Sequence, residues 1–379
     1  MVVHFKAKEE VKQFNLIIFS GMLKDTHELN FTFLDVGGGD AIWTRFLGND
    51  KNWHNILIDG GYAKTYRDGF GPLIRSITAK ERVDLWVISH IDLDHIGAVL
   101  GFTEDKAIKD KPAAVAKFWF NHSPLLVAQG TGKLGVVQGV KVRTYLEQHG
   151  LLSKEGITTK LEPSDFWGLR IKVLSPSPEK ARVADELWKE EEHRTKTGRR
   201  ADQADHKQKF EDLANKDFSE DSNPWNGSSI ALLLEFNGVR ALLLADSHPS
   251  TVAESLCRLG FSAEKPLDAT FVQLSHHGSK VNTSAELLRL INTDTYVVTG
   301  NGITNRHPDK ETLVRVLSLE GRPQRTISFI FSSDSKELRG LFAVDGEVYS
   351  KYDFCCIFPE AGQLYQSLNY LPLNETNDE

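Results

Sequence analysis

Cysteine is scarce in this sequence of 379 residues, and the three that it has are Cys257, Cys355 and Cys356. None of them is spaced like a pair of zinc-finger ligands, and the adjacent residues 355 and 356 are poorly placed to bridge each other. The sequence therefore argues against a disulfide framework, and this cysteine usage fits a reducing compartment.

Long hydrophobic runs are also missing. No stretch approaches the roughly 20 consecutive apolar residues that a membrane-spanning helix needs. The first residues, 1–10, contain no apolar core of the length found in signal peptides. We therefore expect a cytoplasmic protein without a membrane segment.

An excess of positive charge is the third feature that the sequence lacks. Lys and Arg number 45 against 52 Asp and Glu, which gives a formal net charge of −7. This excludes a global positive field of the kind that attracts nucleic acid, but local basic patches and metal ions could still hold phosphate groups. A hydrophobic content of 40% and a charged content of 26% are ordinary for a globular protein.

Apolar stretches typical of β-strands alternate with helix-like segments in both halves of the chain. The dipeptide Asn237-Gly238 predicts a tight hairpin, because both residues accept positive φ. Residues with metal-binding side chains recur where predicted strands end, which indicates two packed sheets flanked by helices. A helix is predicted over 72–80, and strands are predicted over 29–36, 41–47, 55–58, 83–88, 229–236, 239–245, 269–275 and 296–299.

Two segments differ from this pattern within a chain that we treat as a single domain, 1–379. Residues 179–223 are dense in charged side chains and predict a solvated helical insertion or a loop. The alternative is an arm over the active site, with basic side chains facing phosphate: Arg194, Lys196, Arg199 and Arg200. Residues 366–379 predict a flexible, acidic tail.

The strongest signal is a cluster of metal-binding residue types directly after the apolar run 83–88. His90 and Asp92 are spaced to hold one ion, and Asp94 and His95 to hold a second. Asp246, at the end of a later strand, is predicted to bridge the two ions. His276 is predicted as a terminal ligand, with His277 as its competitor. Two divalent ions about 3.5–4 Å apart can activate a bridging water and stabilise the attacking and leaving oxygens.

These residues resemble the metallo-β-lactamase superfamily, whose hallmark is His-x-His-x-Asp-His. This chain has Asp92 where the hallmark has its second His, a variant that is similar to the hydrolase domain of the competence protein ComEC and its stand-alone relatives. Further segments resemble the motifs of that family, and they are Asp35-Val36-Gly37-Gly38-Gly39-Asp40, Asp59-Gly60-Gly61, Asn226-Gly227-Ser228, Leu244-Ala245-Asp246, His276-His277-Gly278-Ser279-Lys280 and Asn305-Arg306-His307-Pro308. The resemblance implies an α/β fold, a four-layer αββα sandwich with two metal ions at one edge of the sheets.

The donor set bears on the identity of the metal. Carboxylates come from Asp92, Asp94 and Asp246, and the resemblance lacks the usual third-motif His. Oxygen-rich sites favour manganese or magnesium more than sites built from His alone, whereas zinc also binds mixed sets. We predict two divalent ions, with Mn²⁺ favoured and Zn²⁺ as the alternative.

Other residues are assigned supporting roles. Asp59, Asp35 and Asp40 are predicted to orient the ligands, with a plain turn as the alternative for each. The predicted substrate-binding residues are Asn226, Ser228, His277, Ser279 and Arg306. The alternative for Asn226 and Ser228 is a polar entry to a hairpin, and the alternative for Arg306 is a surface residue without a function. The predicted catalytic residues are Asp94, which would orient the attacking water, Lys280, which would stabilise negative charge, and His307, which would protonate the leaving oxygen.

The function predicted from these residues and from the resemblance is a metal-dependent phosphodiesterase, a nuclease that cleaves DNA, single-stranded DNA in particular, by a metal-activated hydroxide. The alternative is a hydrolase of a small ester: a nucleotide, a phosphocholine-type ester, a lactone or a thioester. A non-catalytic binding module is a third reading, which the intact ligand set disfavours. Nucleic acid is the expected partner, alongside a protein encoded in the same operon, and the sequence does not predict an oligomeric state.

Overall fold

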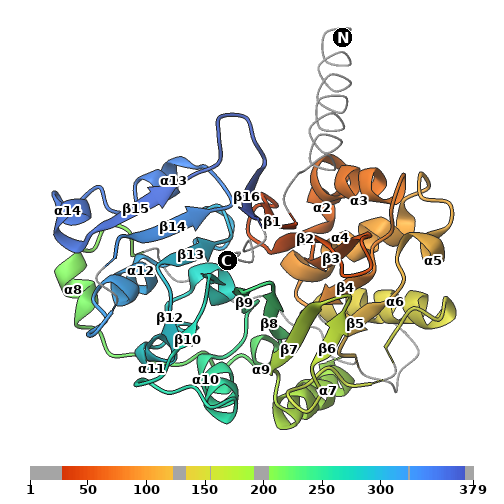
Figure 1. The fold of residues 1–379 in the computed structure, drawn as a ribbon, viewed down its shortest axis with the longest axis horizontal. Coiled ribbons are helices and arrows are strands. Elements are labelled where there is room, and N and C mark those ends of the chain that lie inside the picture. Colours follow the sequence, from red (N-terminus) through yellow and green to blue (C-terminus); the bar gives the residue numbers. More distant parts are fainter. Residues whose placement is uncertain (1–27, 123–133, 154, 192–204, 323–324, 372–379) are drawn as a thin grey trace, which may run out of the picture.

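A computed structural model describes residues 28–122, 134–153, 155–191, 205–322 and 325–371. Two β-sheets pack against each other, and helices cover the outer face of each (Figure 1). The predicted αββα sandwich is therefore confirmed. Among the described residues, no helix combines the length and the apolar character needed to cross a membrane.

The first sheet follows the order β16–β1–β2–β3–β4–β5 in the described chain. Strands β3, β4 and β5 are parallel to one another, and the remaining pairs are antiparallel. The strands are β1 (Leu29–Leu34), β2 (Ala41–Leu47), β3 (Trp53–Asp59), β4 (Leu85–Ile88), β5 (Phe118–Phe120) and β16 (Tyr365–Tyr370).

The second sheet follows the order β15–β14–β13–β11–β9–β8–β7–β6 in the described chain. Its strands from β9 to β15 are parallel, and those from β6 to β9 are antiparallel. The strands are β6 (Ser164–Phe166), β7 (Leu169–Ser175), β8 (Ala231–Phe236), β9 (Val239–Leu243), β11 (Phe271–Gln273), β13 (Thr295–Val298), β14 (Ile327–Phe331) and β15 (Phe354–Ile357). A separate short pair consists of β10 (Leu267–Asp268) and β12 (Ile291–Asn292).

Helices from both halves of the chain cover the outer faces of the two sheets (Figure 1). Those of the first half are α2 (Ala63–Thr65), η1 (Tyr66–Phe70), α3 (Gly71–Thr78), α4 (Leu93–Glu104), α5 (Lys111–Ala114) and α6 (Leu134–Gln148). Those of the middle and second half are α7 (Pro178–Glu191), α8 (Phe210–Ala214), α9 (Pro224–Gly227), α10 (Pro249–Arg258), η2 (Ser275–Gly278), α11 (Ala285–Arg289), α12 (Lys310–Leu317), α13 (Lys336–Arg339) and α14 (Val348–Tyr352).

The core between the sheets follows from the two-residue period of the strands. Phe31 and Phe33 of β1 point toward the second sheet, where the ring centroid of Phe271 lies 5.0 Å and 5.8 Å from theirs. On neighbouring strands, Trp43 and Trp86 face the opposite way and pack under the helices of the first half. Full burial of one such side chain contributes about 1.5–3 kcal/mol, so both faces of this sheet stabilise the fold.

The predicted hairpin is confirmed. Asn237 and Gly238 join β8 to β9 with φ angles of 46° and 82°. Positive φ at both positions is the requirement of the type I′ turn, whose twist matches that of the two strands.

The predicted flexible tail is wrong over its first residues. Tyr365–Tyr370 forms β16, which pairs antiparallel with β1 along its whole length. Its polar side chains also make contacts across the pair of strands, as where the Thr32 and Ser367 hydroxyls lie 3.0 Å apart. An edge strand can be polar because one of its sides remains open to water. Residues 372–379 lie outside the described residues.

The charged segment 179–223 is more than a solvated insertion. Helix α7 buries Trp188 in the core between the first sheet and its helices. Helix α8 buries Phe210 in the core between the second sheet and its helices. The Asp205 carboxylate accepts hydrogen bonds from the backbone N–H groups of Lys310 and Glu311 at 2.8 and 2.9 Å. A few apolar anchors therefore hold a largely polar sequence on the fold. The basic residues of the alternative arm, Arg194, Lys196, Arg199 and Arg200, lie outside the described residues.

Candidate metal centre

The parallel strands of both sheets end at one edge, and the loops that follow them carry the predicted ligands. His90 follows β4, Asp246 follows β9, and His276 and His277 follow β11. Loops at the carboxyl ends of parallel strands are the usual position of functional sites in such sheets. This topology brings together residues that are far apart in the sequence.

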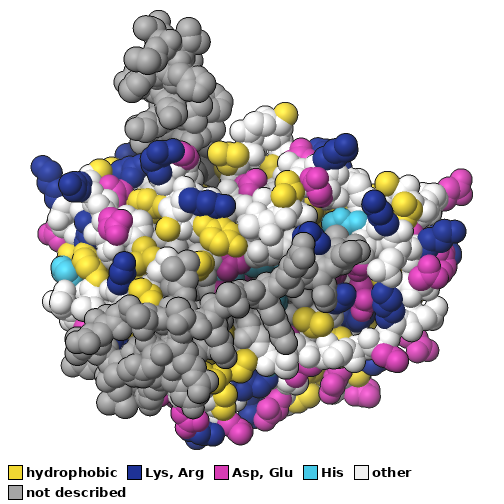
Figure 2. All heavy atoms as spheres, turned by 180° about the vertical axis from the view of Figure 1, so that it is seen from behind, with side chains coloured by type: hydrophobic (Ala, Val, Ile, Leu, Met, Phe, Trp, Pro, Cys, Tyr) yellow, Lys and Arg dark blue, Asp and Glu magenta, His cyan; other side chains and the backbone are white. Residues whose placement is uncertain are grey.

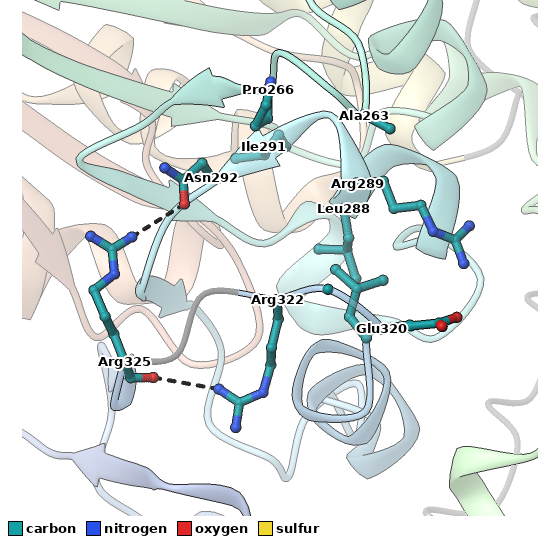
Figure 3. A pocket seen from close by; sticks show the side chains of 11 residues that line it. Ala263, Pro266, Leu288, Arg289, Ile291, Asn292, Glu320, Arg322 and Arg325 are labelled. Carbon is teal, nitrogen blue, oxygen red and sulfur yellow. Dashed lines mark hydrogen bonds between the residues drawn. The ribbon is translucent and has the colours of Figure 1, made fainter.

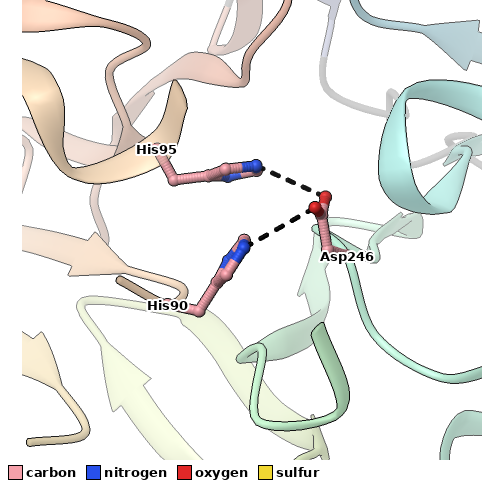
Figure 4. A group of neighbouring side chains, drawn as sticks. All are labelled: His90, His95 and Asp246. Carbon is pink, nitrogen blue, oxygen red and sulfur yellow. Dashed lines mark ion pairs between the residues drawn. The ribbon is translucent and has the colours of Figure 1, made fainter. Parts of the chain in front are cut away.

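Asp246 lies at the middle of the cluster, with its two oxygens directed to different neighbours. Its Oδ1 is 3.4 Å from Nε2 of His95 and 3.9 Å from Nε2 of His277. Its Oδ2 is 3.6 Å from Nε2 of His90 and 3.5 Å from Nε2 of His276. Figure 4 shows His90 and His95 converging on this carboxylate from the opposite sheet. Ligands about 2.0–2.2 Å from one tetrahedral ion lie roughly 3.4–3.6 Å from each other, so this spacing suits an ion better than hydrogen bonds.

Nδ1, the ring nitrogen that faces away from Asp246, already has a partner in both His90 and His95. Nδ1 of His95 lies 2.7 Å from Oδ2 of Asp59, and Nδ1 of His90 lies 3.0 Å from Oγ of Ser89. Ser89 Oγ donates its own proton to Asp59 at 2.6 Å, so it accepts from His90. With the proton on Nδ1, Nε2 of each ring faces the centre and can bind a cation when it carries no proton, as in metal-binding histidines.

The two later histidines follow the same rule. Nδ1 of His276 lies 2.9 Å from Oδ1 of Asn282, and Nδ1 of His277 lies 3.1 Å from Oδ1 of Asp40. In the neutral tautomers that these acceptors favour, both Nε2 lone pairs also face Asp246. The centre thus has four imidazoles whose free nitrogens converge on one carboxylate.

Several buried atoms without hydrogen-bond partners lie at this centre. Within the described part of the chain, Nε2 of His90, His95 and His277 and Oδ1 of Asp246 are buried and make no hydrogen bond. Each unsatisfied buried group costs about 1–3 kcal/mol, and native proteins satisfy nearly all such groups. Divalent cations would satisfy these atoms together, so the residues present fit a metal centre.

His276 and His277 are adjacent yet face different oxygens of Asp246. Their φ angles of 51° and 56° place both in the left-handed region, which non-glycine residues seldom adopt. Asp59, Ala245 and Arg306, also at this edge, have positive φ as well. Backbone strain of this kind concentrates at functional sites.

The geometry therefore uses both histidines where the sequence left them as competitors. One ion position is bounded by His90, Asp92, His276 and Oδ2 of Asp246, with Oδ2 of Asp92 3.8 Å from Nε2 of His90. The other is bounded by Asp94, His95, His277 and Oδ1 of Asp246.

We predict that His276→Gln and His277→Gln each lower the bound metal from two ions to about one per chain. Each variant removes a nitrogen from a different ion position, while Asp246 and the other ligands remain. Metal analysis of the dialysed proteins measures this, with His149→Gln, at an exposed histidine just after α6, as the matched control. Full occupancy in His276→Gln would show that His276 is not a ligand.

Asp94 is oriented by Asn305, a residue to which the sequence alone assigned no role. Nδ2 of Asn305 donates to Oδ2 of Asp94 at 2.7 Å and to the carbonyl of Gly38 at 3.0 Å. The glycine-rich loop approaches Asp94 closely, since a Cβ added to Gly39 would lie 1.9 Å from the Asp94 carbonyl oxygen. This approach explains why the loop tolerates only glycine there.

Asn305→Ala is predicted to lower kcat/KM by about 10–100-fold, the usual effect of removing a group that orients a metal ligand. The metal content should fall less, because Asp94 itself remains. Steady-state kinetics and metal analysis, with the exposed Asn215→Ala as control, measure the two effects. Unchanged kinetics would contradict this positioning role.

The pKa values reflect the packing of opposite charges. Burial opposes ionisation of Asp246, but the adjacent His276, His95 and His277 outweigh it and hold its pKa well below the usual range. Burial likewise opposes ionisation of Asp94, and the adjacent imidazole of His277, with the charge of His95, lowers its pKa to about 2. Both carboxylates are ionised at neutral pH and available to cations.

The predicted orienting carboxylates separate into two kinds. Asp59 is fully buried and holds Ser89 and His95, and Asp40 is buried against His277 and Gln273. Asp35 instead accepts from the N–H of Gly37 at 3.1 Å, within its own loop. Among the described residues Asp35 forms no metal-capable group, so its contact is that of a turn residue.

The predicted substrate contacts are also placed differently from one another. Asn226 donates to Asp221 at 2.7 Å, behind His276, and Ser228 donates to the Trp225 carbonyl. Ser279 is buried. His277 belongs to the metal-binding groups rather than to a substrate surface.

The predicted catalytic groups of the last motif border the centre. The ring of His307 lies 5.0 Å from that of His276, and its Nδ1 is 3.4 Å from Oδ2 of Asp309. Burial lowers the pKa of His307, against the hydrogen bond with Asp309, which raises it. The imidazole is therefore neutral at neutral pH, whereas the sequence predicted a proton donor at this position.

Lys280 and Arg306 supply positive charge beside this centre. The backbone N–H of Lys280 donates to Asp309 at 2.9 Å, while its ammonium makes no hydrogen bond with the described residues. Arg306 is exposed on the loop between Asn305 and His307. These two cations are the predicted phosphate-binding groups that lie on loops next to the centre.

Asp221 and Asn282 were not predicted from the sequence. Nδ2 of Asn282 donates to Oδ2 of Asp221 and to the carbonyl of Asp246, each at 3.2 Å, while its Oδ1 accepts from His276. Both residues therefore fix the ring of His276. No motif indicates them, because they come from loops that meet only in the folded protein.

A cavity of about 640 Å³ lies away from the metal centre, beside β12 and α11 (Figure 3). Arg322 donates to the carbonyl of Arg325, and Arg325 donates to Asn292 at 3.2 Å. The metal-binding groups do not border this cavity, so its size alone does not make it the functional site.

Comparison with known proteins supports the superfamily seen in the sequence. Residues 51–177 match the family model of the metallo-beta-lactamase superfamily. No curated protein matches the chain. This segment carries His90, Asp92, Asp94 and His95, so the match covers the first half of the centre.

Several solved structures share a distant likeness. A mutant of the CmlA β-hydroxylase is 12% identical with a TM-score of 0.40, covering 91% of this chain and 54% of its own, so the chain spans about half of that protein's length. A Cronobacter sakazakii metallo-β-lactamase HARLDQ motif mutant is 11% identical (TM-score 0.30; 66% and 77% covered). A protein of unknown function from Enterococcus faecalis V583 is 11% identical (TM-score 0.28; 87% and 76% covered). At these scores the likeness carries no functional information.

The fold and the set of converging donors form a candidate metal centre. The match over residues 51–177 relates this segment of the chain to the metallo-β-lactamase superfamily.

Proposed function

We propose that this protein is a metal-dependent phosphodiesterase that cleaves nucleic acid, with DNA, and single-stranded DNA in particular, as its substrate. The observation that carries the proposal is the convergence of four imidazole nitrogens and three aspartates on two adjacent ion positions. Phosphodiesters suit such a centre because two cations can neutralise the charge that accumulates during an in-line displacement.

The residues present favour Mn²⁺, with Zn²⁺ as the alternative. Each ion position combines two nitrogens with two carboxylates, one of them the shared Asp246. Oxygen donors suit Mn²⁺ better than a site built from histidine alone. When bound, such cations supply Lewis acidity, which polarises the ester and lowers the pKa of a water molecule.

The protein's own groups would divide the remaining work. Asp94, held by Asn305, would orient the attacking water. Lys280 and Arg306 would hold the nonbridging phosphate oxygens, because charge-assisted hydrogen bonds to phosphate are strong. His307, neutral with Nδ1–H toward Asp309, would take up a proton at Nε2 and pass it to the leaving oxygen.

Charge on the described surface fits a polymer bound locally rather than along a continuous basic track. In the view of Figure 2, positive and negative side chains are interspersed across the face. A net charge of −7 also disfavours binding by a general field. Phosphate recognition would therefore be concentrated at the centre itself.

The proposal is tested with purified protein, Mn²⁺ and labelled single-stranded DNA, double-stranded DNA and RNA, beside Asp94→Ala. We expect cleavage of single-stranded DNA by the wild type and loss of at least about 10³-fold in the variant, as for removal of an essential polar group at a reaction centre. Parallel reactions with Mg²⁺ and Zn²⁺ rank the metals, and turnover supported by zinc alone would contradict the preference for manganese.

Two results would overturn the proposal. Intact polymers with rapid hydrolysis of a phosphocholine-type ester or a lactone would show a small-ester hydrolase. No turnover of any substrate, together with no bound metal, would show a non-catalytic module.

A further inference from the structure

A pocket of about 320 Å³ opens directly beside the metal centre and shares His90 with it. Its walls come from the loops after β4 and β5, the segment around Gly156 and Thr158, helix α7 and the turn α9. Because the His90 ring is both a predicted ligand and a wall, a group in this pocket would lie next to the reacting ester. A volume near the lower end of the range for ligand pockets suits one small ring system rather than a polymer segment.

The inner wall of the pocket is apolar and aromatic. Ile91, Trp188 and Trp225 line it and are almost fully buried, and the two indole rings lie 6.4 Å apart at 69°. The ring of Trp188 packs closely on helix α6, because a Cβ added to Gly139 would lie 2.6 Å from it. A wall of this kind favours a flat aromatic group, because such groups gain both apolar burial and ring contacts.

The rim of the pocket is polar and carries a cation. Arg182 lines it from α7, and 60% of its side chain is exposed where it pairs with Glu186 at 2.6 Å. An exposed ion pair of this type contributes little, so the guanidinium can exchange Glu186 for a phosphate. An apolar slot next to a cationic rim matches a planar base that is joined to a phosphodiester.

Helix α7 is held at its start, so the pocket has a defined shape. Nζ of Lys180 donates to Nδ1 of His248 at 2.9 Å, and His248 Nε2 lies 3.1 Å from the carbonyl of Asn223. On the other side of the pocket, the Asn121 amide bonds both backbone groups of Ile157 at 2.8 and 2.9 Å. The walls are thus preformed, which lowers the cost of binding.

We propose that this base pocket binds an unpaired nucleobase adjacent to the scissile phosphate and so makes the enzyme selective for single strands. The inference rests on the proposed phosphodiesterase function and adds the group that determines specificity. A base inside a duplex is stacked and paired and cannot enter the pocket unless it is extruded.

The test fills the pocket without touching the metal ligands. Ala181→Leu on α7 adds a side chain where Ala181 lines the pocket, and both residues are strong helix formers. Ala113→Leu, at an exposed position of α5, is the matched control. The substrates are single-stranded oligothymidylate and the same oligomer with abasic residues, both with Mn²⁺.

We expect the wild type to cleave oligothymidylate on the order of 10–100-fold faster than the abasic oligomer, from the usual contribution of base stacking. Ala181→Leu should lose this preference while its rate on the abasic oligomer stays unchanged. Equal wild-type rates on the two oligomers, or equal rates on single and double strands, would overturn the base pocket and leave the phosphodiesterase standing.

A binding measurement keeps the two proposals separate if neither oligomer is cleaved. Quenching of tryptophan fluorescence in the Mn²⁺-loaded protein is compared for thymidine 5′-monophosphate and 2-deoxyribose 5-phosphate. Tighter binding of the nucleotide that Ala181→Leu abolishes would support the base pocket even where the proposed function fails. Equal binding of the two ligands would overturn it.

Discussion

Replacing Asp246 by asparagine should abolish turnover and leave the protein with fewer than one tightly bound ion. The carboxylate contributes one oxygen to each ion position, at 3.4–3.9 Å from four imidazole nitrogens. An amide has one oxygen and no charge, so both positions lose a negative ligand together. We expect kcat to fall by at least about 10³-fold, more than for loss of a single stabilising hydrogen bond.

The fold of Asp246→Asn should survive, because asparagine has the same shape. In the absence of metal the variant should be somewhat less stable, because it removes one partner of buried ion pairs, whereas Asp59 and Asp40 still pair with His95 and His277. Asp268→Asn, at the exposed end of β10, is the matched control. Wild-type metal content in Asp246→Asn would refute the bridging arrangement.

Metal loading should stabilise the protein more strongly as pH rises. Burial opposes protonation of His277, but the charges of Asp40 and Asp246, the hydrogen bond to Asp40 and the adjacent carboxylate of Asp94 raise its pKa to about 10. The pKa of His95 is also raised well above its usual value, against burial, by Asp246 and Asp59. In the metal-free protein both rings are therefore protonated at pH 7, and each must release a proton when Nε2 binds a cation.

The direction of the effect follows from these pKa values. A folded-state pKa above the unfolded value of about 6.5 contributes stability that is fully present below that pH. The contribution of His277 is lost as pH rises toward about 10, so the metal-free protein becomes less stable over this interval. Over the same interval protons compete less with the metal for Nε2. Affinity should rise by up to about tenfold per pH unit for each proton released.

Calorimetry and thermal unfolding measure both effects. Titration with Mn²⁺ at pH 7 in buffers of different ionisation enthalpy should show release of about two protons, one from each ring. A hundredfold excess of free metal over its dissociation constant gives about 2.7 kcal/mol, or several degrees in Tm for a chain of this size. Binding without proton release, or a Tm gain that falls between about pH 6.5 and 9, would contradict the raised pKa values.

Much of the fold could be predicted from the sequence because its signals are local. Alternating apolar residues indicated β1, β2 and the β8–β9 hairpin within about two residues of their observed bounds. The error in β16 has a physical cause, since Leu368 and Tyr370 are its only apolar residues packed on the core between the sheets, and they alternate with the polar Ser367 and Asn369. The same applies to α7, where the buried Trp188 is an apolar anchor in a charged sequence.

The sequence by itself indicated the candidate donors of the metal centre, because His90 and Asp92 lie on the loop after β4 and Asp94 and His95 follow in the first turn of α4. Only the tertiary structure decided how the remaining ligands divide, with His276 and His277 on different oxygens of Asp246 and with Asn282, Asp40 and Asn305 behind them. The reason is that these contacts join loops that follow separate parallel strands. Such contacts depend on strand order and on left-handed backbone at two adjacent residues, and neither leaves a periodic pattern in the sequence.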